Sequence, residues 1–210
     1  MRKIKFSNNE FYHIFNRGVE KRNIFNNKKD LERFLKSMKA FNSVLPIGSL
    51  YEQSFQKDKI KNPLVNFIAF SLLPNHFHFI LEQVYEGGIS EFMKRLMGGY
   101  TWYFNQKNKR SGVLFQGRFK ANHIDSNEYL LHSSVYVNLN HKQKLGGWTA
   151  KSRELIKSSW EEYLDKTKES FCDKDIVLNQ FNNPEEYKEF ALSSLEDIKF
   201  NKERYKDLER

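Results

Sequence analysis

The 210-residue chain is long enough for one compact domain with an appendage, or for two small domains. It contains no apolar run near the roughly 18 residues that span a membrane, and its first residues lack the apolar core of a signal peptide, so we expect a cytoplasmic protein with no membrane partner. The single cysteine, Cys172, excludes an internal disulfide and a metal cluster built on cysteines.

The net charge of +9 is unevenly distributed along the chain. Residues 1–150 carry 23 Lys and Arg against 11 Asp and Glu, whereas residues 151–210 carry 12 against 15. A lysine excess spread evenly over the chain would indicate only solubility. A basic excess confined to one part of the chain favours a polyanionic partner such as nucleic acid.

The beginning of the chain predicts a strand, a loop and a helix. Phe11–Gly18 has the aromatic content of a strand and ends in a turn with glycine. Lys21 and Arg22 follow in a loop, where they either contact phosphates or remain solvated. Apolar residues at three- and four-residue spacing predict a helix over 27–41, with Asn27 or the asparagine before it as the N-cap.

The most informative stretch is a buried strand followed by a strand with two histidines. Leu64–Leu72 is nearly all apolar, and the Pro74-Asn75 turn folds the chain into an antiparallel partner strand. Side chains alternate along a strand, so His76 and His78 project from one face and the phenylalanine that follows each of them projects from the other. Such a pair either hydrogen-bonds within the core or offers two nitrogen ligands to a divalent metal. Its place after a turn favours the metal site.

A second helix is predicted over 90–105, with its first residue, a serine, as the N-cap. Its polar side carries Lys94 and Arg95, and its end runs into a basic cluster that contains Lys109 and Arg110. Aromatic residues are interleaved with these cations. The mixture is suited to stacking on unpaired bases and to neutralising phosphates.

A further strand is predicted over 112–121. Within it, Gly117 permits a bulge or the close approach of another backbone. Arg118 and Lys120 alternate with a phenylalanine and would therefore lie on one face. We expect both to point toward a substrate groove.

The last helix of the basic part is predicted to start at Asp125 and to end near Lys142. Asp125 is followed three residues later by Glu128, which is the spacing of a capping box. One side of this helix is apolar and is expected to dock on the sheet, through Leu131, Val135 and Leu139.

The other side of this helix combines a possible nucleophile with a possible metal ligand. Tyr136 and Asn140 are four residues apart and share a face with Tyr129 and His132. A phenol has a pKa of about 10 and attacks well only when a base or a metal assists it. Attack on a phosphodiester would leave a covalent phosphotyrosine, while the Asn140 carbonyl suits a hard divalent ion. From spacing alone, the choice between Tyr136 and Tyr129 stays open.

Four short motifs follow one another across residues 11–146. They are Tyr12-His13-Ile14-Phe15-Asn16-Arg17-Gly18, Leu73-Pro74-Asn75-His76-Phe77-His78, Phe115-Gln116-Gly117-Arg118-Phe119-Lys120, and Glu128-Tyr129-Leu130 through Tyr136-Val137-Asn138-Leu139-Asn140. Each piece is short, but the combination is specific. In this combination the chain resembles the HUH single-tyrosine transposases, in particular the REP-associated tyrosine transposase branch.

The resemblance implies a ferredoxin-like α+β fold, with an antiparallel sheet, helices packed on it and a small helical C-terminal appendage. It also implies that His76, His78 and Asn140 bind Mg²⁺ or Mn²⁺. Tyr136 would attack single-stranded or hairpin-bearing DNA, leaving a 5′-phosphotyrosine and a free 3′-OH. The implied function is that of a metal-dependent single-strand DNA endonuclease and strand transferase.

Two positions refine the comparison with this family. Tyr129 matches a family position that is not the nucleophile, which resolves the choice between the two tyrosines. His141 stands where the family usually has proline, which affects how the helix ends. Family members read DNA through basic surfaces, and the residues expected to form such a surface here are Arg17, Lys21, Arg22, Lys94, Arg95, Lys109, Arg110, Arg118 and Lys120.

We expect residues 1–147 to form the catalytic domain and residues 148–210 a helical extension. The net negative charge of the extension argues against a main role in phosphate binding. Whether it contacts a DNA hairpin, covers the site or holds a second subunit stays open, as does the choice between a monomer and a homodimer. Two other functions compete: a non-catalytic nucleic-acid-binding regulator derived from a transposase, and a metal hydrolase that uses water.

Overall fold

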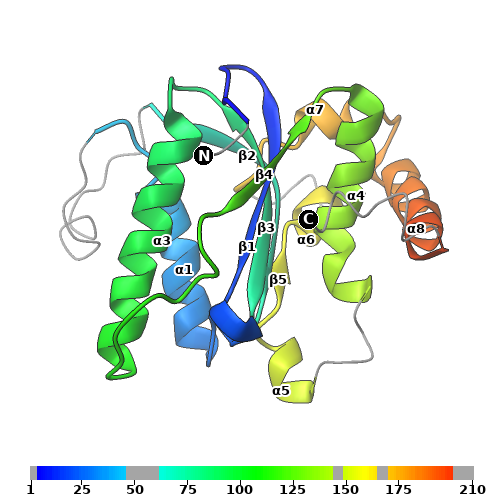
Figure 1. The fold of residues 1–210 in the computed structure, drawn as a ribbon. Coiled ribbons are helices and arrows are strands. Elements are labelled where there is room, and N and C mark those ends of the chain that lie inside the picture. Colours follow the sequence, from blue (N-terminus) through cyan, green and yellow to red (C-terminus); the bar gives the residue numbers. More distant parts are fainter. Residues whose placement is uncertain (1–3, 46–61, 144–148, 165–169, 201–210) are drawn as a thin grey trace.

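The chain folds into one five-stranded antiparallel sheet with helices on both faces (Figure 1). The computed structural model describes residues 4–45, 62–143, 149–164 and 170–200. None of the helices in these ranges is long and apolar enough to cross a membrane. In chain order the elements are β1 (Phe11–Arg17), the 3-10 helix η1 (Val19–Lys21), α1 (Lys28–Ala40), β2 (Val65–Leu73), β3 (His76–Gln83), α3 (Gly88–Lys107), β4 (Lys120–Ile124), α4 (Asn127–Gln143), α5 (Ala150–Arg153), β5 (Lys157–Ser158), α6 (Trp160–Leu164), α7 (Asp175–Leu178) and α8 (Pro184–Phe200).

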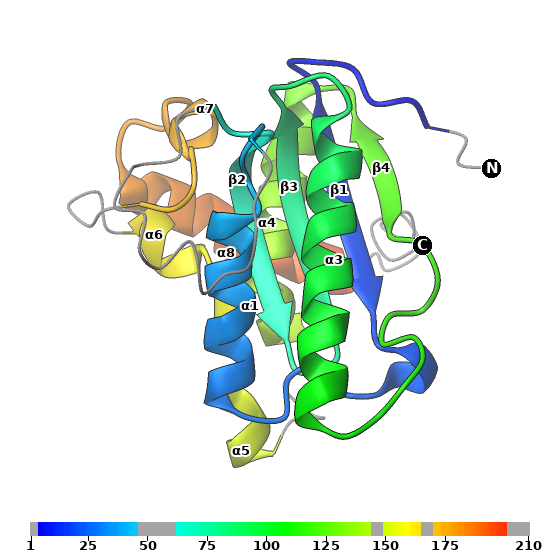
Figure 2. The same ribbon diagram turned by 90° about the vertical axis from the view of Figure 1, so that its left-hand side faces the viewer.

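The order of elements from β1 to β4 confirms the predicted ferredoxin-like α+β fold. The strands lie in the order β4-β1-β3-β2-β5, so the first four form the sheet of a β-α-β-β-α-β unit. Both helices of this unit, α1 and α3, cover the same face of the sheet, while α4 covers the opposite face (Figures 1 and 2). The strand with the two histidines, β3, lies in the middle of the sheet.

Two apolar cores lie on the two faces of this sheet. Phe77 and Phe79 of β3 belong to the core under α1 and α3, whereas Ile80 belongs to the core under α4. The apolar strand predicted before the turn is β2, and it pairs antiparallel with β3, as predicted. Because β3 is covered on both faces, the positions of its alternate side chains are set by burial.

The predicted helices exist, but two of the three predicted caps are wrong. Asn27 caps α1 as predicted, since its side chain accepts from the Asp30 N–H at 3.2 Å. Helix α3 instead starts after Gly87, which has a φ of 70°, so Ser90 lies inside its first turn. At the start of α4 the hydroxyl of Ser126 accepts from the backbone N–H of residue 129 at 3.2 Å, in place of the predicted box between Asp125 and Glu128.

The strand predicted over 112–121 is wrong for most of its length. Strand β4 begins only at Lys120, and the residues before it form a loop. This loop makes an isolated bridge between Phe115 and Gly18, and its Gln116 N–H donates to the Arg17 carbonyl of β1 at 2.8 Å. Gly117 adopts a φ of +67°, a left-handed conformation that ends an extended strand. Leu114 and Phe115 of this stretch, which resemble part of a strand pattern, are buried from a loop.

The C-terminal extension shares the sheet and covers α4. Strand β5 pairs with β2 through Ser158 and Ser71, and Ser159 donates its hydroxyl hydrogen to Asn138 Oδ1 of α4 at 2.6 Å. On α8, the hydroxyl of Tyr187 accepts from Asn138 Nδ2 at 3.1 Å and contacts the Ser134 hydroxyl at 3.0 Å. The predicted boundary between residues 147 and 148 lies outside the described residues, so the division into two domains stays a prediction.

Candidate active site

Strand β3 places its two histidines on the face of the sheet that α4 covers. His76 and His78 are 9% and 5% exposed, and the planes of their rings are nearly perpendicular, with centroids 5.3 Å apart. The phenylalanines between and after them are fully buried on the other face. The predicted alternation is confirmed, and it brings both imidazoles to one point beneath α4.

Helix α4 brings the predicted tyrosine and asparagine to these histidines. The ring of Tyr136 lies edge-on to that of His78, with centroids 5.5 Å apart. One turn further along, Asn140 Oδ1 lies 3.4 Å from Nε2 of His76. Tyr136 and Asn140 are both buried, at 2% and 0% exposure. The four residues therefore meet between β3 and α4.

Helix α4 meets the sheet through Tyr136 as well as through Val135 and Leu139, which lie in the same apolar core as residues of β2 and β3. Helix α8 packs against α4 from another side. His132, predicted on the tyrosine face, contacts Phe190 of α8 instead. Helix α4 also continues through His141 to Gln143, as expected for a chain without proline at that position.

Sequence reasoning missed His13 of β1. Its side chain is fully buried, and its Nε2 lies 3.0 Å from Nδ1 of His78. Burial lowers the pKa of His13 to about 3, so this imidazole is neutral at physiological pH. The ring also stacks on Phe15 and meets the edge of Tyr136. The two-residue spacing between His13 and Phe15 could have placed them on one face of β1, but the contact of His13 with His78 depends on the pairing register of β1 and β3.

Sequence reasoning also missed the role of Asn75 in the turn before β3. Its Oδ1 lies 2.6 Å from Nδ1 of His76, and its Nδ2 donates to the carbonyl oxygen of Lys21 at 3.2 Å. The turn is held by its backbone as well, since Gly18 N–H donates to the Asn75 carbonyl at 2.8 Å. A side chain at Gly18 is excluded, because a Cβ there would lie 2.1 Å from the carbonyl oxygen of Arg22.

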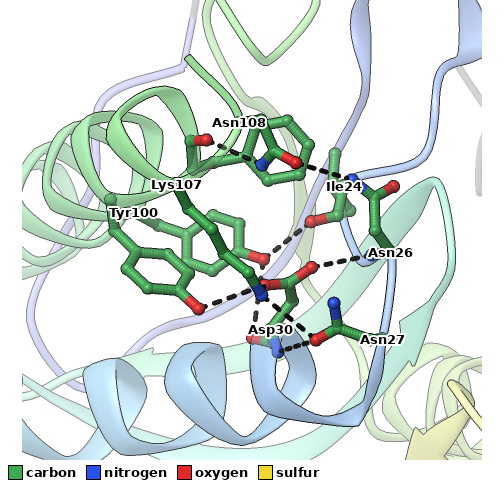
Figure 3. Close-up of polar contacts among 9 residues, drawn as sticks. Ile24, Asn26, Asn27, Asp30, Tyr100, Lys107 and Asn108 are labelled. Atoms are coloured by element: carbon green, nitrogen blue, oxygen red, sulfur yellow. Dashed lines mark hydrogen bonds and ion pairs between the residues drawn. The ribbon is translucent and has the colours of Figure 1, made fainter. Parts of the chain in front are cut away.

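A buried polar network fixes residues 24–30, the segment that leads into α1 (Figure 3). The carboxylate of Asp30 is fully buried and accepts from Lys107 Nζ at 2.5 Å, from the Tyr103 hydroxyl at 3.1 Å and from the Asn26 backbone N–H at 2.9 Å. Tyr100 donates to the Ile24 carbonyl at 2.7 Å. Backbone N–H groups at residues 24 and 25 donate in turn to the Pro74 carbonyl. The network thus connects α1 and α3 to the turn that precedes His76.

We expect Asp30→Ala to lower the free energy of unfolding by about 3 kcal/mol, because Lys107 and several buried donors lose their acceptor. Urea unfolding followed by circular dichroism measures the change. Glu185→Ala is the control, since Glu185 pairs with Lys188 at the surface and should cost less than about 1 kcal/mol. Equal losses in the two variants would contradict a structural role for the network.

The site opens into a cavity of about 450 Å³. Three of the residues predicted to bind DNA, Arg17, Lys21 and Lys120, line it together with the histidines and Tyr136. None of the described residues that line it is acidic. The Lys120 ammonium also lies 5.9 Å from the centre of the Phe15 ring. A cavity with this lining attracts phosphate and offers aromatic surface beside it.

The other predicted DNA-binding residues do not line this cavity. Arg118 and Lys94 line a second cavity of about 740 Å³, between α3 and the N-terminal segment. The prediction that Arg118 and Lys120 share one groove is therefore wrong, because β4 starts only at Lys120 and no strand alternation relates the two. Arg95 is held by Glu91 at 2.8 Å and by the Ser43 carbonyl at 2.6 Å.

Three basic residues on loops or at a helix end complete the predicted set. Arg22 pairs with Glu20 at 3.2 Å on the surface. Arg110 donates to Asn105 Oδ1 at 2.5 Å and to the Val113 carbonyl at 2.9 Å, so it closes the loop after α3. Lys109 is exposed beside it. DNA contacts by these residues stay a prediction.

The residues between β3 and α4 fit a divalent cation. Among the described residues, no three His, Cys, Asp or Glu side chains form a metal-binding group, but the predicted set includes the amide of Asn140. Octahedral Mg²⁺ keeps neighbouring ligand atoms about 3 Å apart, and Asn140 Oδ1 lies 3.4 Å from His76 Nε2. Asn140 turns its oxygen to His76 although its buried Nδ2 has no hydrogen-bond partner in the described part of the chain. If His76 carries its hydrogen on Nδ1, a cation between its Nε2 and Asn140 Oδ1 would explain this orientation.

Comparison with known proteins gives a family and similar solved structures. A family model described as "Transposase IS200 like" matches residues 7–140. A search of curated proteins finds no match. One solved structure, "Structure of the REP associates tyrosine transposase bound to a REP hairpin", is 13% identical, with a TM-score of 0.47, and the match covers 81% of this chain and 88% of that chain. The family match includes all of the site residues described above.

Proposed function

Since this chain belongs to the IS200-like transposase family, we propose that it cleaves and rejoins single-stranded DNA through Tyr136. The observation that carries the proposal is the contact between Tyr136 and His78 in a cavity lined by Arg17, Lys21 and Lys120. The proposed nucleophile, the two proposed histidine ligands and three cations suited to phosphate thus lie in one site. Metal-assisted transfer of a phosphodiester to a protein side chain uses these three components.

In the proposed reaction the hydroxyl oxygen of Tyr136 attacks the phosphorus of a phosphodiester. A new bond joins phosphorus to the tyrosine oxygen, and the bond to the 3′-oxygen of the preceding nucleotide breaks. The departing oxygen gains a proton and becomes a 3′-OH, the phenol loses its proton, and the following DNA stays attached as a 5′-phosphotyrosine. Attack of a 3′-OH on that phosphotyrosine restores the tyrosine and joins two DNA ends.

His76, His78 and Asn140 would hold Mg²⁺ or Mn²⁺, which when bound polarises a phosphoryl oxygen and stabilises the leaving oxygen. The remaining residues have roles of their own. Arg17, Lys21 and Lys120 bind the phosphates on either side of the reacting one. The packing of α4 between the sheet and α8 keeps the tyrosine ring in place.

We propose single-stranded or hairpin-bearing DNA as the substrate and the cytoplasm as the location of the protein. The direct test is cleavage of labelled oligonucleotides, with and without a hairpin, in the presence of Mn²⁺. A protein–DNA adduct that survives denaturation supports the proposal, and cleavage without an adduct contradicts it. The proposal does not require a homodimer, which would be an alternative arrangement of the same site.

We expect the triple variant Arg17→Gln, Lys21→Gln and Lys120→Gln to bind single-stranded DNA with a weaker salt dependence. Each lost phosphate contact lowers the slope of log affinity against log salt by roughly 0.7, so the slope should fall by about 2. Fluorescence anisotropy at several KCl concentrations measures it. Lys188→Gln on α8, which pairs with Glu185, is the control. An unchanged slope in the triple variant would place the DNA elsewhere.

A further inference from the structure

Each of the two proposed metal-binding histidines has its Nδ1 atom held by a neighbouring side chain. His76 Nδ1 lies 2.6 Å from Oδ1 of Asn75, and His78 Nδ1 lies 3.0 Å from Nε2 of His13. In a neutral imidazole one nitrogen carries the hydrogen and the other has the lone pair that a metal needs. The partner of Nδ1 therefore decides whether Nε2 can coordinate.

At His76 the hydrogen-bond network determines this choice. The Nδ2 group of Asn75 donates to the Lys21 carbonyl, and this contact fixes which end of the amide faces His76. The atom that faces His76 is then an amide oxygen, which only accepts hydrogen bonds. A neutral His76 donates at the shorter of its two contacts with amide oxygens, from Nδ1 at 2.6 Å, so its Nε2 has the lone pair and lies 3.4 Å from Asn140 Oδ1.

The position of Asn75 does not depend on His76. The Pro74 carbonyl accepts the N–H groups of Ile24 and Phe25 at 2.7 and 3.0 Å, and Gly18 N–H donates to the Asn75 carbonyl. The Asp30 network fixes the chain around residue 24 from the other side (Figure 3). The acceptor for His76 is therefore preorganised by the fold, as an orienting residue requires.

At His78 the partner is the fully buried imidazole of His13. Its ring stacks on that of Phe15, with centroids 4.9 Å apart, and on that of His78, with centroids 5.2 Å apart. These contacts and the pairing of β1 with β3 hold its Nε2 at the edge of His78. When this Nε2 accepts the hydrogen of His78 Nδ1, the other nitrogen of His78 has its lone pair.

We propose that Asn75 and His13 are positioning residues that hold His76 and His78 with hydrogen on Nδ1, so that both Nε2 atoms can bind the metal. This inference rests on the proposed function, because it concerns the metal site of that reaction. In this role both residues act through the two histidines. Their contribution is a correct imidazole tautomer and ring orientation before the metal arrives.

The test uses the full chain in which the histidines are labelled with ¹⁵N. Two-bond ¹H–¹⁵N spectra of the metal-free protein report the tautomer of each imidazole, and calorimetry measures Mn²⁺ affinity. The variants are Asn75→Leu, which removes the acceptor, Asn75→Asp, which keeps one, and His13→Phe, which keeps an aromatic ring. Asn66→Leu is the matched control, since Asn66 lies on β2 and donates to Glu82.

We expect both histidines of the parent protein to carry hydrogen on Nδ1. Asn75→Leu should shift His76 toward the other tautomer and weaken Mn²⁺ binding 10- to 100-fold, while Asn75→Asp and Asn66→Leu stay close to the parent. His13→Phe should do the same at His78, and it decides the question if Asn75→Leu does not fold. Loss of Mn²⁺ affinity without a tautomer change would be a general effect of structure and would overturn the inference.

Two other results separate this inference from the proposed function. Hydrogen on Nε2 of His76 in the parent protein, or unchanged Mn²⁺ affinity in folded Asn75→Leu and His13→Phe, overturns the inference even if the protein cleaves DNA. Hydrogen on Nδ1 of both histidines in a parent protein that does not bind Mn²⁺ supports the positioning by Asn75 and His13. That result would overturn the metal site of the proposed function.

Discussion

Tyr136→Phe is expected to abolish the covalent protein–DNA adduct and to reduce DNA cleavage by at least about 10³-fold. The variant lacks only the attacking oxygen, and its ring can keep the edge contacts with His13 and His78. We therefore expect unchanged folding, unchanged DNA affinity and unchanged Mn²⁺ affinity. An oligonucleotide labelled at its 3′ end detects the adduct on a denaturing gel, because the 5′-phosphotyrosine retains that part of the strand.

Tyr129→Phe is the matched control for this experiment. Tyr129 lies on the same helix, two turns before Tyr136, and packs beside the core under α4. The control should cleave and form the adduct like the parent. An adduct in Tyr136→Phe at the parental level would show that another side chain is the nucleophile.

The same assay separates the proposed transposase from its two rivals. A parent protein that cuts DNA without ever forming an adduct would be a metal hydrolase that uses water. A parent protein that binds DNA in a salt-dependent way, and neither cuts it nor responds to chelation, would be a non-catalytic regulator. Only the transposase mechanism predicts that removal of the Tyr136 hydroxyl abolishes both the cleavage and the adduct.

Removal of the metal is expected to have an effect of similar size. Chelation should lower cleavage by at least about 10³-fold, and added Mn²⁺ should restore it. His78→Ala should weaken Mn²⁺ binding at least 100-fold, since it removes one of three proposed ligands, and added Mn²⁺ should not restore its cleavage. Calorimetry and the oligonucleotide assay measure the two quantities.

His123→Ala provides the control for the metal experiment. His123 lies on β4, is partly exposed and contacts Glu10 at 2.7 Å, and it is not among the residues that line the cavity. Mn²⁺ affinity and cleavage should match the parent. Full cleavage by His78→Ala, or by the chelated parent, would contradict a metal site at β3 and α4.

Local patterns predicted most of the ferredoxin-like unit. The apolar run before Pro74 and the alternation after it define β2 and β3, because burial on one or both faces depends on spacing along a single strand. The helical period of 27–41 and the asparagine before it define α1 in the same way. Where apolar residues are buried from a loop, as between Gly112 and Lys120, the same pattern predicts a strand that does not form.

The site shows the same division between local and long-range information. Two pairs could be recognised from spacing alone, His76 with His78 and Tyr136 with Asn140. A spacing of two residues on a strand, or of four on a helix, places two side chains on the same face. That these two faces meet, with 3.4 Å between His76 Nε2 and Asn140 Oδ1, was expected from the family resemblance. The nucleophile and metal ligands themselves stay predictions until the assays above are done.

The sequence by itself thus determined the two histidines on one strand face and the tyrosine and asparagine on one helix face, since each depends on periods within a single element, whereas the α+β class was implied by the family resemblance. Tertiary structure decided which side of α4 meets the sheet, which cations share a cavity with the histidines, and the partners of their Nδ1 atoms. His13 and His78 are 65 residues apart, and no local period relates them. Only the pairing of β1 with β3 brings them within 3.0 Å.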